Sequence, residues 1–181
     1  YWDDTFSGQT AYGNIFYNVT GKALMVGGGR DHLIKNNIAI NSEYPILFDD
    51  RLRAGFDRNG WVGNRKGWYL STVKAHPVDK EPWASRYPHL KELTADGSDP
   101  ENINFCANPA YAVIENNVFV PYHDWGICIE ETVKKFGTVK NNLCFKCAED
   151  CTTDGKYTLK EEVKKLLPGF EDIPIEKIGR Y

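Results

Sequence analysis

The sequence contains no block of basic residues and no long apolar run. Its 181 residues include 22 Lys and Arg against 25 Asp and Glu, which gives a formal net charge of −3. This mildly acidic balance argues against nucleic acid or an anionic membrane surface as a binding partner. Apolar runs stay well short of the roughly 18 residues that a membrane-spanning helix needs. We therefore expect neither nucleic acid nor a membrane among the partners of this chain.

The sequence also lacks an even set of cysteines. It has five, namely Cys106, Cys128, Cys144, Cys147 and Cys151, and an odd number does not fit a simple disulfide framework. The spacing of the last three suggests a metal site, but a fourth ligand at a standard spacing is missing. Thiols are commonly buried as small hydrophobes. We expect core or free thiols, with a disulfide or a metal site as the alternatives, and we assign no metal ligands.

What the sequence does contain is a repeated phrase in which Asn precedes a short apolar run. Its copies lie at residues 13–17, 36–40, 116–120 and 141–145. Asn14 and Asn37 are 23 residues apart, and Asn117 and Asn142 are 25 apart. A period in this range is typical of stacked repeats, in which each unit is too small to be buried alone and lies on its neighbour. The sequence therefore predicts an all-β fold, a parallel β-helix of about four to five coils spaced about 4.8 Å apart.

Asn has two expected roles at the corners of these coils. It tolerates left-handed backbone geometry and bonds to its own local backbone, which suits a tight turn between strands. When coils stack, equivalent Asn side chains align along the axis, where their amides can form a ladder of hydrogen bonds. The sequence therefore predicts an amide ladder at the repeated corner.

We expect the whole chain, residues 1–181, to form one β-helix domain. Short apolar segments at 23–26 and 45–48 are bounded by Gly and polar residues, which is typical of strands. The repeat lapses between about 53 and 108, where we expect an insertion. A segment at 83–93 favours one or two short helical turns. Insertions into stacked repeats gather on one face, which is often the binding face.

The two ends of the chain carry separate expectations. The tail, about 152–181, should hold a helix at 159–167, stopped by Pro168 and Gly169, that caps the last coil. The chain opens inside an expected strand at Tyr1, with no signal peptide before it. Because an open β-helix end is an exposed edge, we expect N-terminal β-helix coils of a parent chain to stack there as a partner.

Aligning the coils by their Asn corners brings acidic residues of different coils to the same ends of the strands. In this alignment Asp3 and Asp4 lie beside Val26 and Gly27, with a register good to about one residue. We call the aligned set the acidic wall; it comprises Asp3 and Asp4, then Gly27, Gly28, Gly29, Arg30 and Asp31, then Asp49, Asp50 and Arg51, with Glu130 and Glu131 at the same end of the same strand type. The glycines leave space for carboxylates and allow a ligand to approach the backbone.

Carboxylates placed in this way suggest acid–base chemistry. Carboxylates two coils apart would be separated by about 9.6 Å, twice the strand spacing. Inverting glycoside hydrolases hold their acid and base roughly 6.5–9.5 Å apart. Neighbouring carboxylates such as Asp49 and Asp50 repel each other, which raises one pKa and supplies a general acid. Two alternatives remain open, a calcium site built from carboxylate oxygens and acidic residues that only solvate a turn or form a weak ion pair.

Other polar and aromatic side chains extend the candidate site. The expected substrate-binding residues are Asp3, Arg30, Asp31, His32, Arg51, Trp83, Arg86, Glu130 and Glu131. His32 is a candidate base, although a single His beside a strand is more often a partnered structural residue. Trp83 and Arg86 either cover the wall as a substrate-stacking lid or anchor the insertion to the coils.

Several of these phrases together resemble a known group of proteins. The segments are 14–17, 26–32, 36–40, 48–51, 82–88 and 173–181. The first four together resemble bacterial right-handed parallel β-helix proteins of the pectate-lyase-like superfamily. The segments 82–88 and 173–181 are similar to the C-terminal half of one such secreted group, and the resemblance covers most of the chain. The resemblance implies a right-handed coil, a polysaccharide-related role and a secreted or periplasmic location in a bacterium. It implies no catalytic residues, because function lies in the site and not in the fold.

The sequence thus predicts a carbohydrate-active protein that binds a polysaccharide or oligosaccharide, most simply a glycoside hydrolase. Asp49 or Asp50 would be the general acid and Asp4 the base that activates water. The enzymatic alternative is a polysaccharide lyase, in which Arg51 or Arg30 abstracts a proton and Asp-bound calcium neutralises a uronate. The non-enzymatic alternative is a glycan-binding or adhesion module. No cofactor is expected apart from that possible calcium.

Overall fold

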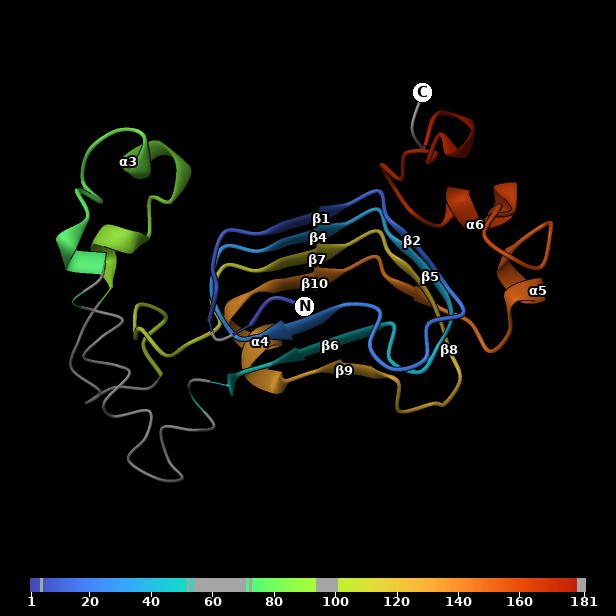
Figure 1. Ribbon diagram of the computed structural model, residues 1–181, viewed down its shortest axis with the longest axis horizontal. Coiled ribbons are helices and arrows are strands. Elements are labelled where there is room, and N and C mark those ends of the chain that lie inside the picture. The colour runs from blue at the N-terminus through green and yellow to red at the C-terminus, as the bar shows by residue number, and fades with distance from the viewer. Residues whose placement is uncertain (4, 52, 54–70, 72, 94–100, 179–181) are drawn as a thin grey trace.

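The computed structural model describes residues 1–3, 5–51, 53, 71, 73–93 and 101–178, in which strands stack into three parallel sheets (Figure 1). The first sheet has the order β1 (Thr10–Tyr12), β4 (Leu33–Lys35), β7 (Val113–Glu115), β10 (Thr138–Lys140). The second has the order β2 (Ile15–Tyr17), β5 (Ile38–Ser42), β8 (Val118–Pro121), β11 (Leu143–Cys144). The third has the order β3 (Met25–Gly27), β6 (Ile46–Asp49), β9 (Ile127–Ile129).

Successive strands of the chain enter different sheets, and each sheet collects one strand from every turn of the chain. All strand pairs within the sheets are parallel, for example Val26 with Phe48 and Ile34 with Ile114. The prediction of stacked parallel strands is therefore confirmed, and the arrangement is compatible with a parallel β-helix. The apolar segments expected at 23–26 and 45–48 form β3 and β6, each displaced by one or two residues.

The interior of the stack is filled by alternate side chains of these strands. Val26, Phe48, Ile34, Ile114 and Ala39 have at most 1 % of their surface exposed and belong to one apolar cluster. Because side chains alternate between faces of a strand, the residues between them point outward. This alternation places polar residues at strand ends on the outer surface, where the acidic wall lies.

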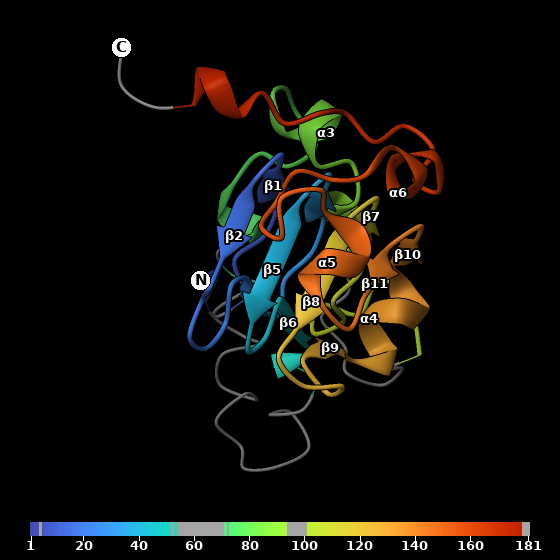
Figure 2. The same ribbon diagram turned by 90° about the vertical axis from the view of Figure 1, so that its right-hand side faces the viewer.

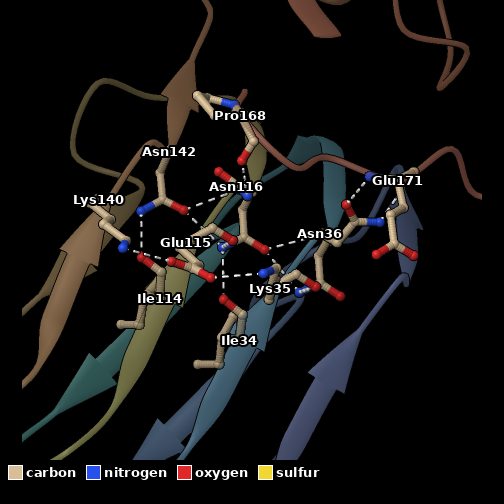
Figure 3. Close-up of polar contacts among 12 residues, drawn as sticks. Ile34, Lys35, Asn36, Ile114, Glu115, Asn116, Lys140, Asn142, Pro168 and Glu171 are labelled. Atoms are coloured by element: carbon tan, nitrogen blue, oxygen red, sulfur yellow. Dashed lines mark hydrogen bonds and ion pairs between the residues drawn. The ribbon is translucent and has the colours of Figure 1, made fainter. Parts of the chain in front are cut away.

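The repeated corner forms the predicted amide ladder. The side-chain amide of Asn14 donates to Asn37 Oδ1 at 2.9 Å, Asn37 donates to Asn117 Oδ1 at 2.9 Å, and Asn117 donates to Asn142 Oδ1 at 2.8 Å. Figure 3 shows the Asn142 end of this ladder, where its amide also donates to the Ile114 carbonyl at 2.8 Å. The corner residues just before the ladder take left-handed φ angles, 66° at Gly13, 61° at Asn36, 55° at Asn116 and 52° at Asn141.

The insertion contains the helical turns expected at 83–93, namely α3 (Trp83–Arg86) and the 3₁₀ turn η1 (Leu90–Glu92). It is attached to the coils by aromatic rings. The Tyr87 ring packs so closely on Gly8 that a Cβ added to this glycine would lie 2.3 Å from the ring. His89 stacks on Tyr111, with ring centroids 3.6 Å apart. The insertion thus packs on the corner that leads into the first sheet.

The C-terminal part of the chain differs from its expected placement. After α4 (Glu131–Phe136) it forms α5 (Ala148–Cys151), α6 (Glu161–Lys165) and the 3₁₀ turn η2 (Ile175–Lys177). The helix predicted at 159–167 is present as the shorter α6. It covers the outer face of the second sheet, and not the end of the last coil, because Val163 and Leu167 pack with Ile38 and Val118. Figure 2 shows this segment running across the strands.

Two corner asparagines fix this C-terminal segment in place. Asn36 and Glu171 form a reciprocal pair, in which the side-chain amide donates to the Glu171 carbonyl and the Glu171 N–H donates back, both at 2.7 Å. Asn116 donates to the Pro168 carbonyl at 2.8 Å (Figure 3). At these two corners the left-handed residue therefore holds the C-terminal segment, while the next residue, Asn37 or Asn117, holds the neighbouring coil.

The five cysteines are free thiols, as the odd count suggested. Cys106 and Cys151 are buried, whereas Cys144 and Cys147 are exposed. Cys144 pairs with the buried Phe119 of β8 and yet is exposed itself. It lies on β11, the edge strand of the second sheet in the part of the chain that the structure describes. Among the described residues, no helix has the length and apolarity needed to cross a bilayer.

Candidate functional site

The carboxyl ends of the third-sheet strands bring the acidic wall together. Trp2 pairs with Val26, and Gly27 pairs with Asp49. Asp3 follows Trp2 and therefore lies beside Gly27, one residue away from the expected alignment. Glu130 follows the strand residue that pairs with Phe48 and so comes next to Asp49 in the stack. The sequence alignment thus predicted this grouping to within one residue.

The centre of this group is occupied by the Arg51 guanidinium. Its Nη1 lies 2.6 Å from Asp3 Oδ1 and donates to the Tyr1 hydroxyl at 2.7 Å, and its Nη2 lies 3.7 Å from Asp49 Oδ2. A Cβ on Gly27 would be 3.1 Å from the guanidinium carbon. The glycine therefore clears the surface, as predicted, and the cleared space holds a cation that links carboxylates from two coils.

The Asp49 carboxyl is half-buried at the end of β6, and its surroundings shift its pKa. Its half-buried position raises the pKa of the carboxyl above its ordinary value, and the nearby charges of Asp50 and Asp3 raise it further. The Arg51 N–H, which donates to Asp49 Oδ1 at 3.1 Å, and the Arg51 charge act in the opposite direction. Burial prevails because the guanidinium lies closer to Asp3 than to Asp49. The environment therefore holds the pKa of the Asp49 carboxyl above its ordinary value.

The other acidic residues of the wall have different surroundings. Asp50 accepts a hydrogen bond from the Thr132 hydroxyl at 2.6 Å, which ties it to α4. Glu130 is exposed just before α4, and Glu131 pairs with Lys134 at 2.6 Å. Asp4 lies outside the described residues. The structure therefore groups Asp3, Asp49, Asp50 and Arg51 closely and leaves Glu130 and Glu131 at the margin.

Arg30 lies in the interior and not at the surface of the wall. It is 1 % exposed and donates to the carbonyls of Ile103 at 3.0 Å, Phe105 at 3.2 Å and Asn108 at 3.0 Å. Its guanidinium also lies over the Tyr111 ring, 5.2 Å from the centroid. Arg30 thus fastens residues 103–108 to the coils, and we leave it out of the proposed site.

His32 and Asp31 also lie beneath the surface. His32 is 1 % exposed, stacks on Trp2 with centroids 5.1 Å apart, and places Nε2 3.1 Å from the Gly28 carbonyl oxygen. Its Nδ1 accepts the Gln9 N–H at 3.3 Å. Both ring nitrogens are engaged, which matches the structural reading of this His. Asp31 takes a φ of 56°, and burial raises the pKa of its carboxyl.

The buried imidazole makes the stability of the protein depend on pH. Burial lowers the pKa of His32 below its ordinary 6.5, so the unfolded chain binds the proton more readily than the folded one. Stability is then highest above about 6.5 and falls as the pH is lowered through the range below that value. We expect urea denaturation of the wild type to show this loss between pH 7.5 and 5.5. His32→Gln should show a smaller change over the same range; an equal change in both would contradict the assignment.

Trp83 and Arg86 lie apart from the acidic wall. Both belong to α3, where Trp83 contacts His76 and Tyr87 with ring centroids 5.4 and 6.1 Å apart. Figure 1 shows α3 well separated from the ends of β6 and β9. The ring contacts of Trp83 thus stay within the insertion, and the distance of α3 from the acidic wall disfavours the reading in which Trp83 and Arg86 form a substrate lid.

Sequence reasoning missed two members of the site. Tyr1 donates its hydroxyl hydrogen to Asp3 and accepts one from Arg51. Its position two residues before Asp3 in an extended segment places both on one face, a signal that was available. Thr132 had no such signal, because it reaches Asp50 only through α4, a helix that the repeat pattern did not predict.

Neither a search for metal-binding clusters nor comparison with known proteins assigns a function to the site. Among the described residues, no cluster of three or more His, Cys, Asp or Glu side chains is arranged to hold a metal ion. No family model, curated protein or solved structure matches the chain. The functional argument therefore rests on the geometry of the acidic wall.

Proposed function

We propose that this protein is a carbohydrate-active right-handed β-helix protein of the pectate-lyase-like kind, and that it is a glycoside hydrolase. The reaction takes place on the outer surface at the ends of β3 and β6. The observation that carries the proposal is Asp49, a half-buried carboxyl with a raised pKa that shares one guanidinium with Asp3, a carboxylate two coils away. A polysaccharide substrate accords with a secreted or periplasmic protein of a bacterium, as the sequence motifs suggest.

The spacing of the carboxylates suits hydrolysis. Asp3 and Asp49 stand on either side of Gly27, so their backbones are about two strand spacings, or roughly 9.6 Å, apart. Both side chains lean toward Arg51, which brings the carboxylates closer together than the backbones. Inverting hydrolases hold acid and base roughly 6.5–9.5 Å apart, with a water molecule between them, and two carboxylates carried two coils apart on one surface support such a pair.

In the proposed reaction Asp49 gives its proton to the glycosidic oxygen as the bond to the anomeric carbon breaks. A water molecule attacks that carbon from the opposite face and loses its proton to a carboxylate of the acidic pair Asp3 and Asp4. One sugar leaves with a new hydroxyl group and the other gains the hydroxyl from water. Arg51 keeps its charge throughout and can donate hydrogen bonds to a substrate hydroxyl.

The lyase alternative receives less support from these contacts. A lyase base must be able to accept a proton, and arginine in proteins stays protonated. Arg51 is in addition engaged by two carboxylates and a phenol, and Arg30 is buried under carbonyls. These contacts stabilise the protonated form of both arginines, whereas a base that abstracts a proton must first be deprotonated.

Incubation of the protein with plant and host polysaccharides, with and without EDTA, tests the proposal. We expect new reducing ends without absorbance near 235 nm, at a rate that EDTA does not change, because the reaction needs only carboxylates and water. Absorbance at that wavelength that EDTA abolishes would instead establish a calcium-dependent lyase. Binding without any product would establish a glycan-binding module.

A further inference from the structure

A column of stacked side chains lies at the opposite ends of the same three strands. Lys22 and Tyr44 form a parallel bridge just before β3 and β6, and Trp125 precedes β9 by two residues, as Tyr44 precedes β6. The Lys22 ammonium lies over the Tyr44 ring, 5.6 Å from its centroid, and Trp125 meets Tyr44 edge to face at 5.1 Å. His123 stacks on Trp125, with centroids 4.8 Å apart and the ring planes at 15°. We call these four residues the aromatic column.

The loop that carries Trp125 is held firmly against the coil. The Tyr122 N–H donates to the Ser42 carbonyl at 3.0 Å, and Gly126 donates to the His123 carbonyl at 2.9 Å, which closes a turn. A Cβ on Gly126 would lie 2.6 Å from the Glu43 carbonyl oxygen, so only glycine allows this close approach. The Cys128 thiol adds a hydrogen bond to the Trp125 carbonyl at 3.0 Å. The indole is therefore positioned before any ligand arrives.

Trp125 is nevertheless 54 % exposed, although it is the largest side chain of the column. An indole that is held in place and half exposed can bury apolar area against the C–H face of a pyranose ring without losing side-chain freedom. The lysine and the imidazole beside it supply donors for the hydroxyl groups of the same ring. A single exposed aromatic residue needs no explanation. Side chains from three successive coils that stack on one another at the surface do suggest a binding function.

We propose that the aromatic column is a sugar subsite that holds a neutral oligosaccharide whose chain reaches the acidic wall. Tyr44 is five residues before Asp49 in the same extended segment, which corresponds to roughly 16 Å. This is the length of a short oligosaccharide. Between the two ends lie the outward positions Met25, Leu47 and Cys128, which share one row of the sheet. The inference rests on the proposed function and adds a substrate class to it.

The charges near the acidic wall favour a neutral sugar over a uronate. Among the described residues of 1–3, 49–53 and 130–135, five carboxylates face four cations, namely Asp3, Asp49, Asp50, Glu130 and Glu131 against Arg51, Arg53, Lys134 and Lys135. A chain of uronates would bring further negative charge to this surface, and like charges in proximity cost free energy. A neutral chain meets no such repulsion and can accept and donate hydrogen bonds along the wall.

The experiment measures glycan binding and turnover separately. A glycan array of neutral and uronate-containing oligosaccharides identifies the ligand, and isothermal titration gives its dissociation constant for the full chain. We expect a neutral glycan to bind, and Trp125→Ala to weaken that binding by about tenfold through loss of the stacking surface. Tyr122→Ala is the matched control, since Tyr122 is 48 % exposed in the same loop but outside the column; it should change affinity less than twofold.

The outcomes separate this inference from the proposed function. Unchanged affinity in Trp125→Ala, preference for uronates, or no binding of any glycan on the array would each overturn the subsite. A tenfold loss of affinity in a protein that cleaves nothing would keep the subsite and overturn the hydrolase. Capture of a protein partner by the column in place of a glycan would also overturn the inference.

Discussion

Replacing Asp49 by Asn should lower kcat/KM for the polysaccharide by roughly 10³-fold while leaving the fold intact. A positioned general acid contributes about 10²- to 10⁴-fold to the rate, and an amide of the same shape cannot give up a proton to a leaving oxygen. The substitution keeps a polar group of the same shape beside Arg51, which remains paired with Asp3 at 2.6 Å. Because that pairing persists, we expect little change in the midpoint of urea denaturation.

The pH profile gives an independent signature of the same residue. Burial raises the pKa of Asp49, and a general acid works only in its protonated form. Activity of the wild type should therefore fall as the pH rises through that raised pKa. The residual activity of Asp49→Asn should not show this fall of activity at high pH, the descending limb of the profile. A substitution that only disturbed the structure would lower activity but keep the descending limb.

A matched control separates chemistry from surface charge. Glu161→Gln removes one carboxylate on α6, which pairs with Lys164 at 2.9 Å and lies at the far side of the molecule from β6 (Figure 1). We expect wild-type kinetics in this variant. Wild-type turnover in Asp49→Asn would refute Asp49 as the acid, and retention of the descending limb would move that role to a neighbouring carboxylate such as Asp50.

The stacking of the coils could be predicted from the sequence because it follows from local repetition. The Asn pairs recur at nearly constant spacing, so the corner geometry and the partner of each strand follow from counting residues. The same counting placed Asp49 beside Gly27 correctly and Asp3 within one residue. Where the period is regular, a position along the chain determines the neighbours in space.

Side-chain direction and long-range packing could not be predicted in this way. Arg30 follows three glycines beside the acidic wall, yet its side chain turns inward to the carbonyls of residues 103–108, which lie beyond the lapse in the repeat. The tail helix was predicted correctly as a helix, but amphipathicity does not say which surface it covers. Its position on the second sheet depends on outward apolar side chains such as Ile38 and Val118, which a strand pattern alone cannot distinguish from core residues.

The amide ladder should make Asn117 a position of high sensitivity, and Asn117→Ala should lower the free energy of unfolding by about 3 to 4 kcal/mol. Its Oδ1 accepts the Asn37 N–H and side-chain amide, both at 2.9 Å, and its own amide donates to Ile34 at 3.0 Å and Asn142 at 2.8 Å. Removal leaves several buried groups without their partners, each at a cost of about 1–3 kcal/mol. For a chain of this size the melting temperature should fall by roughly 10 °C.

The end of the same ladder supplies the control. Asn14 is exposed and makes the outermost link, and its own N–H still bonds to Asn37 Oδ1 at 3.0 Å when its side chain is removed. Asn14→Ala should therefore cost only about 0.5–1 kcal/mol. Asn117→Asp should be nearly as damaging as Asn117→Ala, because a carboxylate keeps the acceptor but cannot donate to Ile34 or Asn142. Equal losses for Asn14→Ala and Asn117→Ala in urea denaturation would mean that the corner asparagines act singly, through local turn geometry, and that the ladder contributes no cohesion between coils.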